Sequence, residues 1–103
     1  MTVTGKENAI SNVRQVLWRS VSSLATGTAT IQERLLSPAM FLTSLGPELE
    51  SLPVSSRHEL EAIVQGLTKE RTIDATLRMM SDDEAVKLAN RIVSLYIELR
   101  GGM

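Results

Sequence analysis

His58 is the single histidine of this 103-residue chain, so it is the first residue to consider for chemistry. It lies in the expected first turn of a helix, next to Glu59 and three residues before Glu61. Its imidazole changes charge near neutral pH and could transfer protons, and with Glu61 it could offer two metal ligands. A catalytic zinc ion needs three protein ligands, and no nucleophile is spaced to work with His58. We therefore expect a solvated helical residue, no catalytic residue and no metal site.

Other patterns that carry catalysis or bind cofactors are missing from the sequence. The chain has no cysteine, which excludes thiolate nucleophiles, thiolate metal sites and disulfides. The acidic run at residues 82–84 opens a helix, where the helix dipole favours acids, and it lacks the alternating ligands of a calcium loop. The glycines match neither a phosphate loop nor a dinucleotide-binding turn. We expect a protein that is not an enzyme and has no cofactor.

Arg14 and Trp18 are the pair best suited to binding another protein. They are four residues apart, so on a helix the guanidinium can lie over the indole ring. In the alternative interpretation, the stem of Arg14 packs on the helix while its charged head reaches water. Arginine and tryptophan are both enriched at the energetic centres of protein interfaces. We therefore treat both residues as interface candidates.

The last expected helix adds three further interface candidates. Its apolar residues between 85 and 99 fill about 200° of the helix circumference, whereas a surface helix needs only about 100°. Such a helix contacts two neighbours of its own chain, or one neighbour and a partner chain. The first alternative makes it the central helix of a bundle. In the second alternative the partner chain could be a second copy, so that the protein forms a homodimer with Val86, Val93 and Ile97 in the interface.

The segment 62–78 resembles a helix-turn-helix, in which Gly66 would form the turn and a recognition helix would follow. Ile73 lies one residue too far from Gly66 for the usual tight turn. Glu70 and Asp74 place acids on a segment whose affinity for DNA would depend on neutralising phosphates. In this alternative, the residues that contact nucleic acid would be Lys69, Arg71 and Arg78.

The charge balance also argues against a nucleic-acid partner. The chain has 11 basic and 12 acidic residues and a net charge of −1, whereas a dedicated nucleic-acid or anionic-membrane binder carries a basic excess. No run approaches the roughly 20 apolar residues that span a bilayer, and the first residues lack the apolar core of a signal peptide. We expect one domain over residues 1–103, in the cytoplasm and without a membrane partner.

Four capping boxes set the expected helix starts, because Ser or Thr can cap a helix whose third residue is Glu. Their caps are 26, 26 and 25 residues apart. This spacing predicts an all-α, antiparallel four-helix bundle. The phase of the apolar residues fails near 68–72, which predicts a short additional helix at 72–80 before the C-terminal helix. The four pairs are Thr4–Glu7, Thr30–Glu33, Ser56–Glu59 and Ser81–Glu84.

Pro38 falls inside the second expected helix and leaves two alternatives. Proline removes a helical hydrogen bond and clashes with the preceding turn, so it kinks or breaks a helix. Ser37 and Pro38 could start a new helix as cap and first residue. Alternatively, one kinked helix continues, because Leu42 keeps the phase of Leu35. We favour the kinked helix, which Gly46 and Pro47 would end.

Three stretches resemble small, uncharacterised bacterial helical proteins: Ser23–Leu35, Glu59–Thr68 and Met80–Tyr96, the last containing Met-Ser-Asp-Asp-Glu-Ala. Together they cover less than half of the chain. The resemblance implies a bacterial, cytoplasmic origin and implies no activity, cofactor or catalytic residue.

These observations predict a small, non-catalytic helical module that binds another protein or a second copy of itself. Amphipathic helices supply apolar faces for such binding, whereas the residues that catalysis needs are absent or isolated. The alternative is a helix-turn-helix-like DNA-binding regulator that uses residues 62–78, for which binding to DNA would be sensitive to salt.

Overall fold

The computed structural model describes the backbone of residues 5–101 and the side chains of residues 8–100. The all-α prediction is confirmed, because every regular element of the described residues is helical. In order, they are α1 (Gly5–Thr26), α2 (Ile31–Arg34), α3 (Leu36–Thr43), the 3-10 helix η1 (Pro47–Ser51), α4 (Val54–Leu67), α5 (Ile73–Met79) and α6 (Asp82–Gly101).

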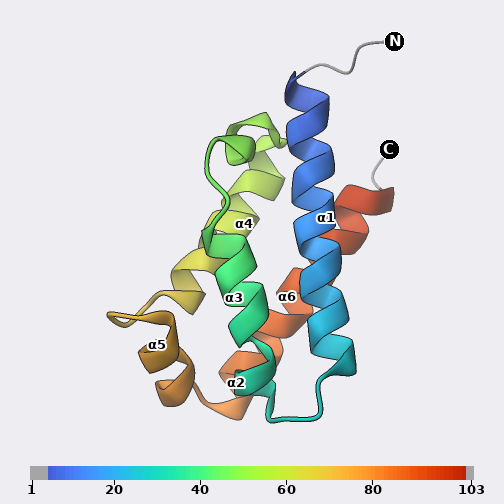
Figure 1. Cartoon of the computed structure of the whole chain (residues 1–103). Helices are drawn as coiled ribbons and strands as arrows, with labels where there is room; N and C mark the ends of the chain where they lie inside the picture. The colour runs from blue at the N-terminus through green and yellow to red at the C-terminus, as the bar shows by residue number, and fades with distance from the viewer. Residues whose placement is uncertain (1–4, 102–103) are drawn as a thin grey trace.

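The chain reverses direction between its main helices (Figure 1). Helix α1 descends from the N-terminus, α2 and α3 return upward, α4 descends, and α6 returns to lie beside α1. Helix α5, the predicted short additional helix, follows α4 in the chain and lies at the lower end of the molecule, where it packs against α2, α3 and α4. These reversals place the inner faces of α1, α3, α4 and α6 around one core.

The core consists mainly of leucine and isoleucine side chains that recur at helical spacing. In α1, Val13 and Leu17 are fully buried and lie four residues apart, on one face of the helix. The inner face of α4 contributes Leu60 and Ile63, both fully buried. Burial of these side chains is the main favourable term in folding. The corresponding residues of α6 are Ala85, Leu88, Ile92, Leu95 and Leu99.

Two of the predicted caps, Thr30 and Ser81, are confirmed at the starts of helices. The Thr30 Oγ1 atom accepts a hydrogen bond from the Glu33 N–H at 3.2 Å, and the Ser81 Oγ atom accepts one from the Glu84 N–H at 3.2 Å. Each satisfies a backbone donor that the first helical turn leaves unpaired. Thr72, which was not predicted as a cap, does the same for α5. The predicted cap Thr4 and the side chain of its partner Glu7 lie outside the described residues.

The predicted cap at Ser56 is wrong. Helix α4 begins two residues earlier, at Val54, and Ser56 is buried within the helix at 3% exposure. Pro53 has the extended conformation of a residue that precedes a helix, with φ −53° and ψ 149°. Its carbonyl oxygen accepts the first helical hydrogen bond, from the Arg57 N–H at 2.9 Å. Proline favours this start because its φ is fixed, and the capping-box pattern did not take it into account.

The preferred interpretation of Pro38, one kinked helix, is also wrong. The segment divides at Leu35, which ends α2 and precedes α3 while keeping a helical backbone with φ −79° and ψ −11°. Pro38 is therefore the third residue of α3, in the first turn, where its missing N–H removes no helical hydrogen bond. The alternative start at Ser37 is not observed either, because no side chain caps α3. Leu35 and Leu42 are both buried, as their common phase predicted.

Gly66 lies inside α4, where it allows α6 to approach closely. A Cβ atom at this position would lie 3.1 Å from the Cδ2 atom of Leu88 on α6. None of the described glycines has a positive φ, so Gly66 serves packing here and does not form a left-handed turn. The chain instead turns after α4 ends at Leu67.

Two arginines bind carbonyl oxygens near the C-terminal ends of the longest helices. The Nη1 atom of Arg34 donates to the Leu24 carbonyl of α1 at 3.1 Å, and the Nε atom of Arg14 donates to the Leu99 carbonyl of α6 at 3.0 Å. These carbonyls are among those that lack an intrahelical partner, and the helix dipole favours a cation there. The two bonds attach α2 to α1, and α1 to α6.

Candidate interface along helix α6

Trp18 lies exposed at the outer edge of the contact between α1 and α6. Its side chain is 55% exposed although it is the largest apolar side chain of the chain. Its ring packs against the ring of Tyr96 on α6, with the ring centroids 5.9 Å apart and the planes tilted by 37°. The pairing fixes the indole in place while leaving much of its surface open to solvent.

The other interface candidates lie along the outer face of α6. Val86 and Ile97 are 46% and 58% exposed, and Val93 between them is half-buried. Eleven residues are close to three turns of an α-helix, so Val86 and Ile97 lie on the same side. Arg14 is half-buried and bound to Leu99 on the neighbouring side of α6. The structure thus brings the five predicted residues to α6 and its contact with α1.

A partly exposed ion pair limits this face on the side of α4. The Nε and Nη2 atoms of Arg91 donate to the two carboxylate oxygens of Glu59, each at 2.8 Å. These hydrogen bonds lower the pKa of Glu59 despite the opposing effect of its partial burial, and they raise the pKa of Arg91. Two parallel hydrogen bonds between a guanidinium and a carboxylate also fix the orientation of the two groups relative to each other. It therefore sets how α6 is rotated against α4.

Sequence reasoning missed two exposed apolar residues on α3. Leu36 and Met40 are 40% and 58% exposed and lie four residues apart, on one side of the helix. The available signal was that α3 is apolar around its whole circumference, apart from Ser37 and Thr43. A second missed pair of exposed apolar residues is Val54 and Met79, which lie on two different helices.

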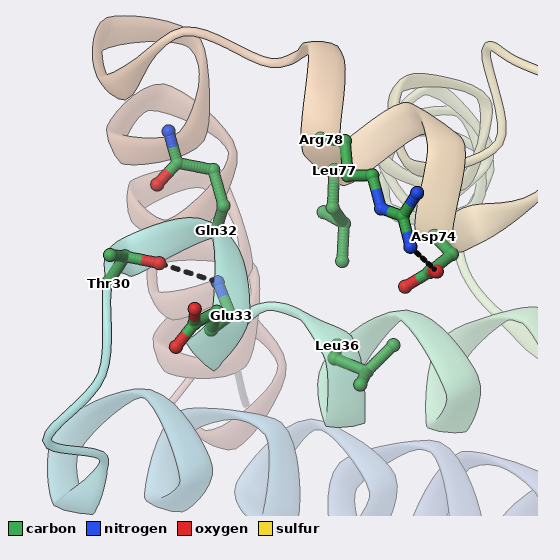
Figure 2. A pocket seen from close by; sticks show the side chains of 7 residues that line it. All are labelled: Thr30, Gln32, Glu33, Leu36, Asp74, Leu77 and Arg78. Atoms are coloured by element: carbon green, nitrogen blue, oxygen red, sulfur yellow. Dashed lines mark hydrogen bonds and ion pairs between the residues drawn. The ribbon is translucent and has the colours of Figure 1, made fainter.

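A groove of about 390 Å³ lies between α2, α3 and α5 (Figure 2). Several of its polar groups are bound within the chain: the Thr30 hydroxyl caps α2, and Arg78 pairs with Asp74 at 3.0 Å. The amide of Gln32 donates to the Met80 carbonyl and to Asp82. A ligand that used the Thr30, Gln32 or Arg78 side chains would therefore compete with existing hydrogen bonds. The groove is lined by Thr30, Gln32, Glu33, Leu36, Asp74, Leu77 and Arg78.

His58 is exposed on α4, and Glu61 is exposed on the same helix. Within the described part of the chain, no group of three or more His, Cys, Asp or Glu residues could hold a metal ion. His58 and Glu61, the pair considered as possible ligands, therefore have no third ligand beside them among the described residues.

The residues of the nucleic-acid alternative lie on and before α5. Lys69 and Arg71 are exposed in the connection between α4 and α5, and Arg78 is exposed on α5. Arg78 is paired with Asp74, which offsets its charge. Gly66, the expected turn residue, lies inside α4. The geometry thus places a longer connection where a helix-turn-helix has its tight turn.

Comparison of the chain with protein-family models, with curated protein sequences and with solved structures finds no match. Among the residues that the structure describes, no helix is long and apolar enough to cross a membrane.

Proposed function

We propose that this protein is a small, non-catalytic helical module whose function is to bind another protein chain. Its binding surface is the outer face of α6, together with Trp18 on α1. The expected bacterial origin and cytoplasmic location are part of the same proposal.

One observation carries the proposal: Val86 and Ile97 are each about half exposed on one side of a single helix. Scattered apolar residues are normal on a protein surface, whereas a contiguous apolar patch indicates an interaction site. Val93 lies between the two residues, and the Trp18–Tyr96 pair extends the patch towards α1. Rigid aromatic anchors beside aliphatic residues are typical of the centre of an interface.

Photo-crosslinking from single positions tests this proposal. A photoreactive phenylalanine analogue placed at Ile97 in cells that produce the protein is expected to form a discrete protein adduct. The same analogue at Val54, which is equally exposed at 59% but lies on α4, is the matched control and should give none. Equal labelling from both positions, or no adduct at Ile97, would contradict the assignment of this face.

A further inference from the structure

We propose that the chain which covers the outer face of α6 is α6 of a second copy, packed antiparallel around a two-fold axis. This inference rests on the proposed function, because it requires that this face binds a protein. It names the partner and the geometry of the contact.

The first argument is the spacing of the residues on this face. Consecutive members are separated by three, four, three, four and three residues, which is the heptad spacing of a helix that packs along another helix. All of them are exposed except Val93, which is half-buried, whereas the core residues of α6 lie on the opposite side. We call these residues the seam: Asp83, Val86, Asn90, Val93, Ile97 and Arg100.

The second argument is the charge at the two ends of the seam. Asp83 and Arg100 are both exposed and form no ion pair with the described residues. In an antiparallel pair whose two-fold axis passes between residues 91 and 92, Asp83 faces Arg100 of the second copy, and the contact occurs twice. In a parallel pair each of these charges would face its own copy and be repelled. The seam is therefore complementary to itself in the antiparallel direction only.

The interior of the seam fits the same axis. Val86 faces Ile97 of the second copy, so the two most exposed aliphatic residues of α6 cover each other. Asn90 faces Val93 of the second copy, and the two copies of Asn90 lie three residues apart along the helix axis, about 4.5 Å, on either side of the two-fold axis. A side-chain amide both donates and accepts hydrogen bonds, so each Asn90 can bind the other. A polar residue at such a position specifies register at some cost in affinity.

The flanks of the seam leave room for this contact. Tyr96, with Trp18 behind it, lies on the flank towards α1, and the opposing residue of the second copy is the small Ala89. A contact limited to one helix face and one flank is smaller than a standard protein interface. We therefore expect a weak dimer whose population depends on concentration, and a measured mass that rises from 11.3 kDa towards twice that value.

Reversing the charges at the ends of the seam tests the antiparallel geometry by light scattering. In either single variant, Asp83→Arg or Arg100→Asp, like charges meet at both ends. The dissociation constant of the dimer is then expected to rise about tenfold or more at low salt, and less at high salt. The double variant restores opposite charges, so its dissociation constant should return close to that of the wild type. A parallel dimer would respond to neither change.

The double variant also separates association from helix stability. Both substitutions place the wrong charge at an end of α6, so the double variant has the least favourable helix dipole of the set. If the double variant dimerises again and circular dichroism shows that it is folded, the recovery cannot be due to a more stable helix. Single variants that dimerise like the wild type, or a double variant weaker than both, would overturn the antiparallel seam.

Two controls distinguish failure of this inference from failure of the proposed function. Ile97→Glu should leave the chain monomeric, whereas Val54→Glu, at a similarly exposed residue outside the seam, should not change the mass. A mass of 11.3 kDa at every concentration, with the analogue at Ile97 attached to a different protein, overturns self-association and leaves the proposed function standing. The same constant mass without any adduct overturns both.

Discussion

Helix α6 has two apolar faces, which differ in what covers them. On the inner face, Ile92 and Leu95 are at most 1% exposed, whereas Val86 and Ile97 on the outer face are about half exposed. Residue type does not distinguish the faces, since both carry aliphatic side chains at helical spacing. The width of the apolar arc indicated that α6 contacts more than one surface. In the folded chain, one part of that arc is buried in the chain's own core and the other part is exposed to solvent.

Shortening one isoleucine on each face should separate the two roles most strongly. Ile92→Ala removes three buried carbon atoms and leaves a cavity, so it should lower the free energy of unfolding by about 2–5 kcal/mol. The matched change Ile97→Ala in dilute solution should alter it by less than about 0.5 kcal/mol. Urea denaturation of both variants measures the difference, and equal losses would show that the outer face also stabilises the fold.

The next largest effect is expected where the inner face meets α4. Gly66→Val places a branched side chain against Leu88, whose Cδ2 atom lies 3.1 Å from the position of a Cβ atom. The unfolding free energy should fall by about 1–3 kcal/mol. Gln65→Val, at the exposed neighbouring position, controls for helix propensity. Introducing Leu88→Ala should make room, so the cost of Gly66→Val measured in that background should shrink. An unchanged cost would mean that the two side chains do not meet.

A smaller loss is expected at the start of α6, which carries both faces. Ser81→Ala removes the hydroxyl that accepts the Glu84 N–H at 3.2 Å and should cost about 1 kcal/mol in thermal or urea unfolding. Ser94→Ala, on the exposed side of the same helix, should stay within about 0.5 kcal/mol. If both variants lose equally, the hydroxyl of Ser81 is not acting as a cap.

The smallest effect concerns the ion pair at the boundary between the faces. Glu59→Gln should lower the unfolding free energy at neutral pH by about 0.2–1 kcal/mol, because the pair is partly exposed to solvent. The pKa of folded Glu59 lies below its ordinary value of 4.5, so the stabilisation is complete above that pH and is lost as the pH falls through the lower value. Glu98→Gln is the exposed control. A stability profile of Glu59→Gln that parallels the wild type in acid would contradict this assignment.

Much of the fold could be predicted because its signals are local. The break before α5 and the caps at Thr30 and Ser81 each depend on residues within one or two turns. The errors at Ser56 and Pro38 have one cause, because a proline constrains the backbone on both sides of itself. At Pro53 this constraint starts α4 before the residue that the capping-box pattern selects. At Pro38 the segment divides, although the common phase of its apolar residues predicted one helix.

The surface could be predicted only in part. The wide apolar arc identified Val86, Val93 and Ile97, and the structure places them on the side of α6 away from the core. The Trp18–Tyr96 pair joins residues 78 positions apart, which no local pattern reveals. Asn90 and the charged ends of the seam did have a signal, the regular spacing of three and four. This regular spacing was not recognised in the sequence because both polar and apolar residues occupy the positions.

The contact between Trp18 and Tyr96 gives the protein its own optical reporter. These are the single tryptophan and the single tyrosine of the chain, 5.9 Å apart. In the folded chain, light absorbed by Tyr96 passes efficiently to Trp18, so tyrosine emission should appear only on unfolding. Because the indole is open to water, its emission should shift to shorter wavelength when a second chain covers α6. Folding and association can therefore be followed separately in one unlabelled sample.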